Sequence, residues 1–136
     1  MGMDVYGKQP SADAGRYFRA SIWAWRPIHE LVCLLCSDLL SEELLKGIGF
    51  NGGSGPDDSE TCLEMADRFT LWLEGCEGGH MVESEQLRVT ETGRLVSERE
   101  LKDRPEMETR SPFYVPRESL DRWVEFLQHC GGFAVY

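Results

Sequence analysis

The 136-residue sequence contains no apolar run of about 18 residues, so we expect no segment of it to cross a membrane. Its first residues, MGMDVYGKQP, also lack the basic start and the apolar stretch of a secretion signal. The five cysteines are an odd number and, without such a signal, are typical of reduced thiols. We therefore expect a cytoplasmic protein.

Motifs for catalysis and for metal binding are also missing. The glycine-rich segment KGIGFNGGSG (residues 46–55) has no Lys followed by Ser or Thr, which a Walker A loop requires. The single C-x-x-C pair, Cys33 and Cys36, falls inside an expected helix, which favours core thiols over a redox or zinc site. No EF-hand spacing occurs, and no serine or cysteine motif surrounds the histidines. We expect no enzyme, no cofactor and no bound metal.

Negative charge is concentrated in the middle of the chain. The formal net charge is −10, and residues 37–91 hold thirteen acidic and three basic side chains. Such a field repels the phosphates of nucleic acids and attracts basic surfaces, so we expect no direct nucleic-acid binding. Two interpretations remain open: a solvated surface that confers solubility, or a surface that binds a basic partner.

Four acidic residues stand beside the glycine-rich segment, at the start of an expected helix: Asp57, Asp58, Glu60 and Glu64. Carboxylates at a helix N-terminus can cap backbone N–H groups and complement the helix dipole, which is one explanation for them. The other explanation is that they are exposed and bind a partner. These four are the candidate residues for an acidic partner-binding surface.

Apolar residues recur at helical spacing in three segments. The first helix is expected to begin at Pro27, because proline suits the first helical position, and its stripe is Ile28, Leu31, Val32, Leu35 and Leu39. The second begins near Asp58 or Ser59 and ends at Gly75, with the stripe Leu63, Ala66, Phe69, Thr70 and Leu73. The third follows Pro116 and ends before Gly131, with the stripe Leu120, Trp123, Val124, Leu127 and Cys130.

Short strands are expected near both ends of the chain. Residues 3–7 alternate in polarity, residues 16–23 are rich in aromatic and β-branched side chains, and residues 133–136 follow a two-glycine turn. The terminal strand should pair with the N-terminal one. This predicts an α+β protein of one domain, residues 1–136, with about three helices packed on a small, mostly antiparallel sheet. The charged residues 78–112 should form an exposed loop or hairpin.

Aromatic and basic side chains mix in GRYFRASIWAWRPIHELV (residues 15–32). Alternation places Trp23 and Trp25 on one side of an extended segment, next to a buried helix, which favours a place in or beside the core. The arginines of this segment either form salt bridges or clamp a phosphate or carboxylate. The candidate residues for such a ligand or anion edge are Arg16, Arg19, Trp25 and Arg26.

The two ends of the sequence carry a resemblance. GMDVYGKQP, then GRYFRASIWAWRPIHEL, and finally FLQHCGGFAVY resemble a family of small hypothetical proteins of phages and bacterial genomes. Members open with a Gly-Met-Asp-Val-Tyr-Gly type motif and end in a Gly-Gly-Phe strand. The similarity covers roughly the first 35 and the last 25 residues. It implies a phage or prophage origin, and the small acidic format resembles phage-borne inhibitors of host defence such as anti-CRISPR proteins.

These observations give two hypotheses of different classes. The first is a small, acidic, phage-type accessory protein in the host cytoplasm. It would bind and inhibit a host protein with a basic surface, such as a nucleic-acid-binding defence complex, without catalysis. The alternative is a small-molecule or nucleotide-binding domain that uses the Trp23, Trp25 and Arg26 edge together with the glycine-rich segment.

Overall fold

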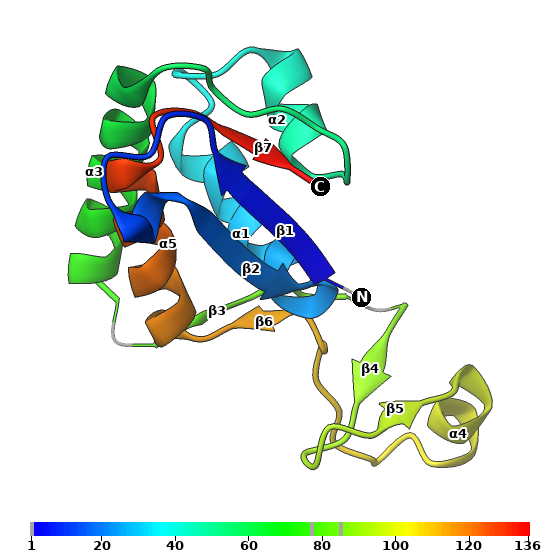
Figure 1. The fold of residues 1–136 in the computed structure, drawn as a ribbon. Coiled ribbons are helices and arrows are strands. Elements are labelled where there is room, and N and C mark those ends of the chain that lie inside the picture. The colour runs from blue at the N-terminus through cyan, green and yellow to red at the C-terminus, as the bar shows by residue number, and fades with distance from the viewer. Residues whose placement is uncertain (1, 77, 85) are drawn as a thin grey trace.

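The computed structural model describes residues 2–76, 78–84 and 86–136. Three antiparallel strands form the central sheet in the order β2 (Tyr17–Ser21), β1 (Gly2–Gly7), β7 (Phe133–Val135) (Figure 1). The register sets Val5 of β1 opposite Phe18 on one side and Val135 on the other. The prediction that the terminal strands pair in an antiparallel sheet is therefore confirmed.

Helices cover one face of this sheet (Figure 1). They are α1 (Ile22–Leu35), α2 (Glu42–Ile48), α3 (Ser59–Glu74) and α5 (Arg117–His129), and a short 3-10 turn, η1 (Asp13–Gly15), links β1 to β2. The α+β class is confirmed. None of the helices in the described residues is long and apolar enough to cross a membrane.

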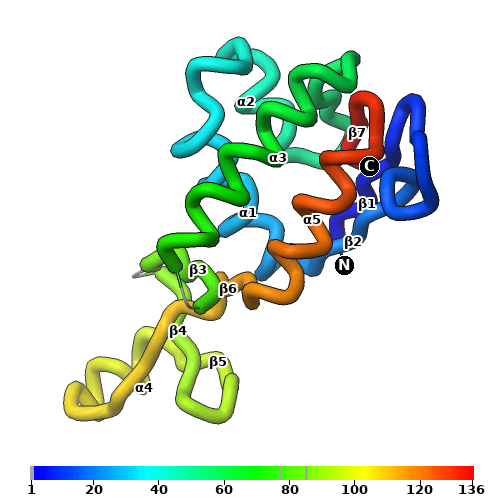
Figure 2. The backbone as a smooth tube through the Cα atoms, turned by 90° about the vertical axis from the view of Figure 1, so that its left-hand side faces the viewer, coloured from blue at the N-terminus to red at the C-terminus, as the bar shows by residue number. Residues whose placement is uncertain are grey.

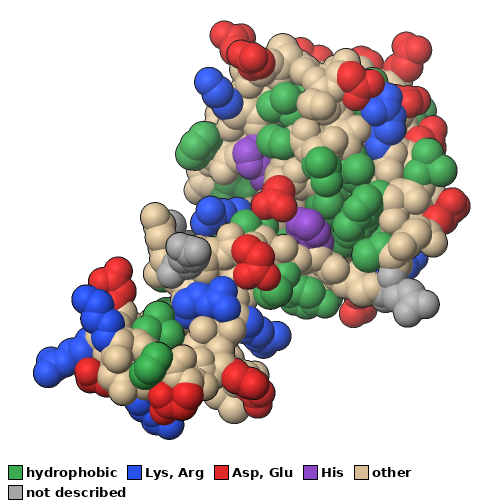
Figure 3. All heavy atoms as spheres, turned by 180° about the vertical axis from the view of Figure 1, so that it is seen from behind, with side chains coloured by type: hydrophobic (Ala, Val, Ile, Leu, Met, Phe, Trp, Pro, Cys, Tyr) green, Lys and Arg blue, Asp and Glu red, His purple; other side chains and the backbone are tan. Residues whose placement is uncertain are grey.

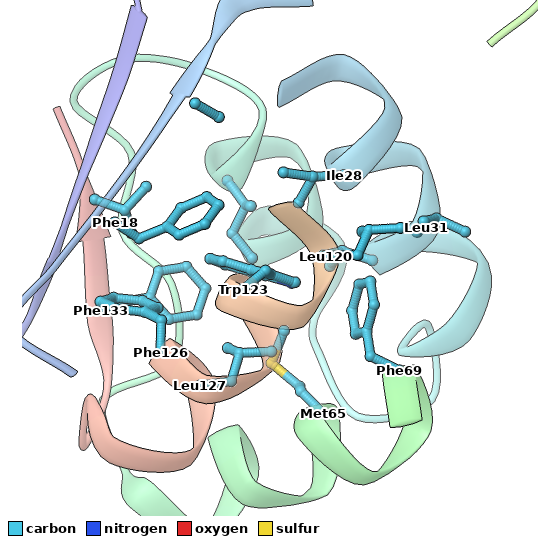
Figure 4. Close-up of a cluster of buried hydrophobic side chains, with 14 of the residues drawn as sticks. Phe18, Ile28, Leu31, Met65, Phe69, Leu120, Trp123, Phe126, Leu127 and Phe133 are labelled. Atoms are coloured by element: carbon cyan, nitrogen blue, oxygen red, sulfur yellow. The ribbon is translucent and has the colours of Figure 1, made fainter. Parts of the chain in front are cut away.

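The core lies between the helices and the sheet and is centred on Trp123 of α5 (Figure 4). Its indole stacks on Phe126 with the ring centroids 5.6 Å apart, and Phe18 of β2 and Phe133 of β7 lie at 5.2 and 5.5 Å. The expected stripe of α5 is confirmed, because Leu120, Trp123, Leu127 and Cys130 are buried and Val124 is half-buried against the core. Aromatic packing across three elements thus joins α5 to both terminal regions of the chain.

The first helix begins earlier than the sequence suggested. The hydroxyl of Ser21 accepts a hydrogen bond from the backbone N–H of Ala24 at 3.2 Å and caps α1, so Pro27 lies inside the helix rather than at its start. The expected start at Pro27 was wrong because the serine cap begins the helix at Ile22, which places Pro27 in the second turn. Trp23 and Trp25 therefore lie about 200° apart around a helix axis, and not on one side of a strand.

One further helix was not expected, and the first helix ends earlier than its apolar stripe suggested. Helix α2 is only seven residues long, contains a glycine and is capped by Ser41, so its apolar spacing is too short to stand out. The first helix ends at Leu35, and Leu39 packs against the core from outside any helix. The glycine-rich segment is thus partly helical and partly a loop.

The second helix is rotated relative to the expected stripe. Ala66, Phe69 and Leu73 are buried as predicted, but Leu63 and Thr70 are exposed and Cys62 and Met65 are buried in their place. Both sets of residues have helical spacing, and only packing against α1 and α5 selects between them. The exchange places a leucine on the solvent side of α3.

A projecting segment leaves the rest of the molecule between two paired strands, β3 (His80–Met81) and β6 (Tyr114–Val115) (Figures 1 and 2). We call residues 82–112 the arm; residue 85 lies outside the described residues. It contains the hairpin of β4 (Arg88–Val89) and β5 (Leu95–Val96) and the short helix α4 (Glu98–Asp103). Its basic and acidic side chains are interspersed over its surface (Figure 3).

Candidate functional site

Asp58, one of the four acidic residues expected to bind a partner, caps helix α3. Its carboxylate accepts hydrogen bonds from the backbone N–H and from the hydroxyl of Thr61, each at 2.8 Å. These bonds stabilise the ionised form and hold the pKa of Asp58 below its ordinary value. For this residue the capping explanation is therefore correct.

Asp57 and Glu64 are each paired with a basic side chain. The ammonium group of Lys8, from the loop after β1, donates to the carboxylate of Asp57. The guanidinium Nε of Arg68 donates to Glu64 at 3.2 Å, one turn along the same helix. Glu60 is exposed and has no ion pair among the described residues. Of the four candidates, Glu60 is the one left for an external partner.

Glu60 belongs to a longer acidic row on the solvent side of α3. Glu60, Asp67 and Glu74 are all exposed and lie seven residues apart, so they follow one line along the helix for about 21 Å. Two exposed leucines flank this row, Leu63 with 47% and Leu71 with 67% of its surface accessible. We call these five residues the α3 outer face.

The basic residue nearest to this face is already neutralised. Arg68, the single basic residue of α3, forms a bidentate pair with Asp38, with both N–O distances 2.9 Å, and also reaches Glu64. Its hydrogen bonds lower the pKa of Asp38 and raise that of Arg68 itself. A third bond, to the carbonyl oxygen of Leu35 at 3.1 Å, ties the guanidinium to the end of α1. Arg68 therefore points toward α1 and does not cancel the charge of the α3 outer face.

The neighbouring helix extends the acidic surface. Helix α5 packs against α3 (Figure 2) and exposes Glu118, Asp121 and Glu125. The guanidinium of Arg117 lies 4.0 Å from the carboxylate of Asp121 and also donates to the carbonyl oxygens of Leu73, at 3.0 Å, and of Cys76. Helix α5 exposes Arg122 as well, so it contributes less negative charge than α3 does.

The basic residues of the proposed anion edge are mostly paired. Arg16 lies 3.3 Å from the carboxylate of Asp13, and Arg19 lies 3.9 Å from that of the half-buried Asp4. The hydroxyl of Tyr17 also donates to Asp4. The salt-bridge explanation therefore accounts for Arg16 and Arg19.

Trp25 and Arg26 each interact with another residue of the chain. Trp25 is 3% exposed and its indole N–H donates to the carbonyl oxygen of Ile48 at 2.9 Å. The guanidinium of Arg26 lies over the ring of Phe113, 4.4 Å from its centroid. Trp25, Arg26 and Gly49 of the glycine-rich segment line one cavity of about 200 Å³, but Trp23, which the alternative hypothesis also used, does not line it. That volume is below the roughly 300 Å³ at which sites for small organic ligands begin.

The cysteines give no sign of a reactive centre. Cys36 is buried as expected, and burial raises its pKa to about 12. Cys33 is only half-buried, with its sulfur 3.6 Å from Nε2 of His29, so the expectation that both thiols lie in the core holds for Cys36 alone. Within residues 2–76, 78–84 and 86–136, no three His, Cys, Asp or Glu side chains are grouped so that they could hold a metal ion.

Comparison of the chain with protein-family models, with curated proteins and with solved structures finds no match.

Sequence reasoning missed most of the α3 outer face. Asp67, Leu71 and Glu74 were not among the candidates, and Leu63 was assigned to the core. The seven-residue spacing of the three acids is visible in the sequence and could have indicated a common face. The exposure of the leucines could not be predicted, because it depends on how the helix is rotated against its neighbours.

Proposed function

We propose that this protein is a non-catalytic binding protein whose α3 outer face engages a basic surface of another protein. The observation that carries the proposal is the acidic row of Glu60, Asp67 and Glu74, which forms no ion pair among the described residues and is flanked by the exposed Leu63 and Leu71. Carboxylates in a row attract a basic partner from a distance, and apolar side chains beside them provide contact area once the partner has docked.

The charge of the rest of the molecule supports this choice of partner. The net charge is −10, and α3 carries four carboxylates against one arginine. A nucleic acid or an acidic protein would be repelled, whereas a surface rich in Lys and Arg would be attracted. The basic partner is thus the one that the electrostatics favour.

We propose further that the partner is a host protein with a basic nucleic-acid channel and that the protein is a phage-type inhibitor of it. Carboxylates in a row can form ion pairs with the Lys and Arg side chains of the partner that otherwise bind phosphates. Binding of this protein would therefore exclude the nucleic acid. The resemblance of both chain ends to small phage proteins supports the same role.

A triple amide variant, E60Q/D67N/E74Q, tests the proposal. Tagged wild-type and variant proteins are used to capture partners from a host lysate, and the captured protein is then purified for affinity measurements at low and high salt. Since an exposed ion pair contributes about 0.2–1 kcal/mol, three lost pairs should weaken binding about tenfold at low salt. High salt should reduce this difference.

The arm offers a matched control, E98Q/E106Q/E108Q, which removes three exposed carboxylates far along the chain from α3. This control should bind the partner as the wild type does. Equal weakening by both triple variants would assign the effect to net charge and contradict a binding role of the α3 outer face. A third variant, L63S/L71S, should weaken binding equally at both salt concentrations, because its loss is apolar.

A competition experiment tests the inhibitory role separately. Duplex DNA or RNA that binds the captured partner should be displaced by the wild-type protein and not by E60Q/D67N/E74Q. Simultaneous binding of nucleic acid and protein to the partner would leave the binding role intact and contradict the inhibition.

A further inference from the structure

One cavity lies where the arm leaves the rest of the molecule, and nothing in the proposed function uses it. Its volume is about 400 Å³. Trp23 of α1 and Tyr114 of β6 form one wall, the hairpin of the arm forms the other, and Arg110, Ser111 and Pro112 form the floor. This volume falls within the roughly 300–1,000 Å³ of sites for small organic ligands.

The walls are held in place by interactions within the chain. Val89 and Arg110 exchange two backbone hydrogen bonds, 2.7 and 2.9 Å long, which fix the hairpin against the floor. On the other side, the ring of Trp23 packs on Phe113 with centroids 5.2 Å apart, and Arg26 covers Phe113. The cavity is therefore formed before any ligand arrives, which reduces the entropic cost of binding.

The floor provides one uncompensated cation. Three arginines of the arm, Arg88, Arg94 and Arg104, have carboxylate partners at 3.5, 3.0 and 3.9 Å. Arg110 has no ion pair among the described residues, and no carboxylate lines the cavity. Its guanidinium is thus available for an anion from outside the chain.

A buried hydroxyl adds a hydrogen-bond donor beside this cation. Ser111 is 1% exposed and is the buried polar residue of the described chain. Its oxygen accepts a hydrogen bond from the backbone N–H of Phe113 at 3.3 Å, and its own O–H donates to no acceptor among the described residues. A buried donor without an acceptor is unfavourable. Because only 1% of Ser111 is exposed, its hydroxyl has to turn toward the cavity before a ligand oxygen can accept this hydrogen bond.

From these observations we infer that the cavity at the base of the arm binds a small planar aromatic anion, such as an aromatic carboxylate. The flat part of the ligand lies between Trp23, Tyr114 and the apolar side chains Val89 and Leu95. Its anionic group faces Arg110 and accepts the hydrogen bond of Ser111. This site is separate from the α3 outer face and does not depend on the proposed function.

The test uses the full-length protein and two probes of the same shape, 2-naphthoate and its uncharged amide. Titration of each probe is followed by the backbone and indole N–H signals in NMR spectra. We expect both probes to shift the signals of the residues that line the cavity, and the naphthoate to bind more tightly. Saturation of these signal shifts at millimolar or lower naphthoate would support the inference. No shifts at millimolar probe, or shifts spread over the whole surface, would contradict it.

Two variants assign the roles within the cavity. R110Q should weaken naphthoate binding about fivefold and leave the amide unchanged, since an exposed ion pair contributes up to about 1 kcal/mol. R99Q, which removes the same charge from an exposed arm position outside the cavity, is the matched control and should change neither. Equal affinities of R110Q and wild type for naphthoate would refute the anion site. The variant E60Q/D67N/E74Q should bind both probes normally, which separates this test from that of the α3 outer face.

Discussion

The arm and the rest of the described chain, which we call the body, are ordered by different interactions. In the body, the ring of Trp123 alone packs against five other aromatic rings, all close to the helix–sheet interface. In the arm, the buried apolar side chains among the described residues are Val82 and Val89. Burial of apolar surface therefore stabilises the body, and it contributes little to the arm.

The arm is ordered instead by local backbone and charge interactions. The backbone N–H of Thr90 donates to the carbonyl oxygen of Arg94 at 2.9 Å and closes the turn of the hairpin. The hydroxyl of Ser97 caps α4. Arg94 pairs with Glu100 across the arm at 3.0 Å. Such exposed interactions contribute fractions of a kcal/mol each, so the arm should open at a lower free energy than the body.

Removal of the last strand should have the largest effect. Phe133 and Val135 are fully buried, and β7 bonds to β1 on one side and to residues 52–56 on the other. Deleting residues 133–136 should abolish cooperative unfolding, because the loss of a buried Phe alone costs about 3–5 kcal/mol. Thermal unfolding followed by circular dichroism measures this.

Deletion of Tyr136 alone is the control for that experiment. Its side chain is 60% exposed and touches Tyr6 on the outer face of the sheet, so the shortened protein should still unfold cooperatively. A protein lacking residues 133–136 that melts like the wild type would show that β7 is not part of the stabilising core.

The same difference explains how much of the fold could be predicted from the sequence. Helix α5 was placed correctly because its apolar stripe is long and ends at two glycines. The N-terminal strand was placed by its alternation, and the last strand by the two glycines that precede it. The strands β3 to β6 have two residues each, too few for any periodicity, and their pairing comes from the tertiary structure. The start of α1 was missed because Ser21 and Pro27 are competing start signals.

The candidate sites were predictable to a smaller degree. The acidic character of α3 follows from composition, and Glu60 was identified from its position at the helix start. The pairing of Asp57 with Lys8 joins residues 49 positions apart, which no local pattern reveals. The same holds for the cavity at the base of the arm, because Trp23 and Arg110 meet only in the folded chain.

Removal of the arm should have an intermediate effect. The backbone N–H of Val82 donates to the carbonyl oxygen of Phe113 at 3.0 Å, so the two ends of the arm are adjacent and a short Gly-Ser linker can replace residues 83–112. The shortened body should unfold cooperatively and lose no more than about 1 kcal/mol, since the interactions removed are mainly exposed pairs. Denaturant unfolding measures the change.

The arm deletion also checks the two proposed sites against each other. The shortened protein should keep the α3 outer face and bind the basic partner, and it should lose binding of 2-naphthoate. A loss of cooperative unfolding would mean that the arm stabilises the body and that the two regions are not independent.

The smallest effect is expected from two matched ion pairs, Asp38 with Arg68 in the body and Glu100 with Arg94 in the arm. In each pair the hydrogen bonds from the guanidinium lower the pKa of the carboxyl group. A lowered pKa in the folded state means that the pair stabilises the protein above the ordinary carboxyl pKa of about 4 and stops doing so as the pH falls through the lowered value. The side chain of Asp38 is 64% exposed and that of Glu100 is 40% exposed, so solvent screens both pairs and the effects are small.

The two pairs should nevertheless differ in which region, the body or the arm, loses stability when the pair is removed. Arg68 connects Asp38 and the carbonyl oxygen of Leu35 to α3, so D38N should lower the midpoint of global denaturant unfolding at pH 7. E100Q should leave that midpoint unchanged and speed hydrogen exchange only in the arm, because the arm opens without unfolding the body. Below the lowered pKa of the carboxyl group that it replaces, each variant should match the wild type, since a protonated carboxyl group no longer pairs with arginine. Equal shifts of the global midpoint by D38N and E100Q would show that the arm and the body unfold as one unit.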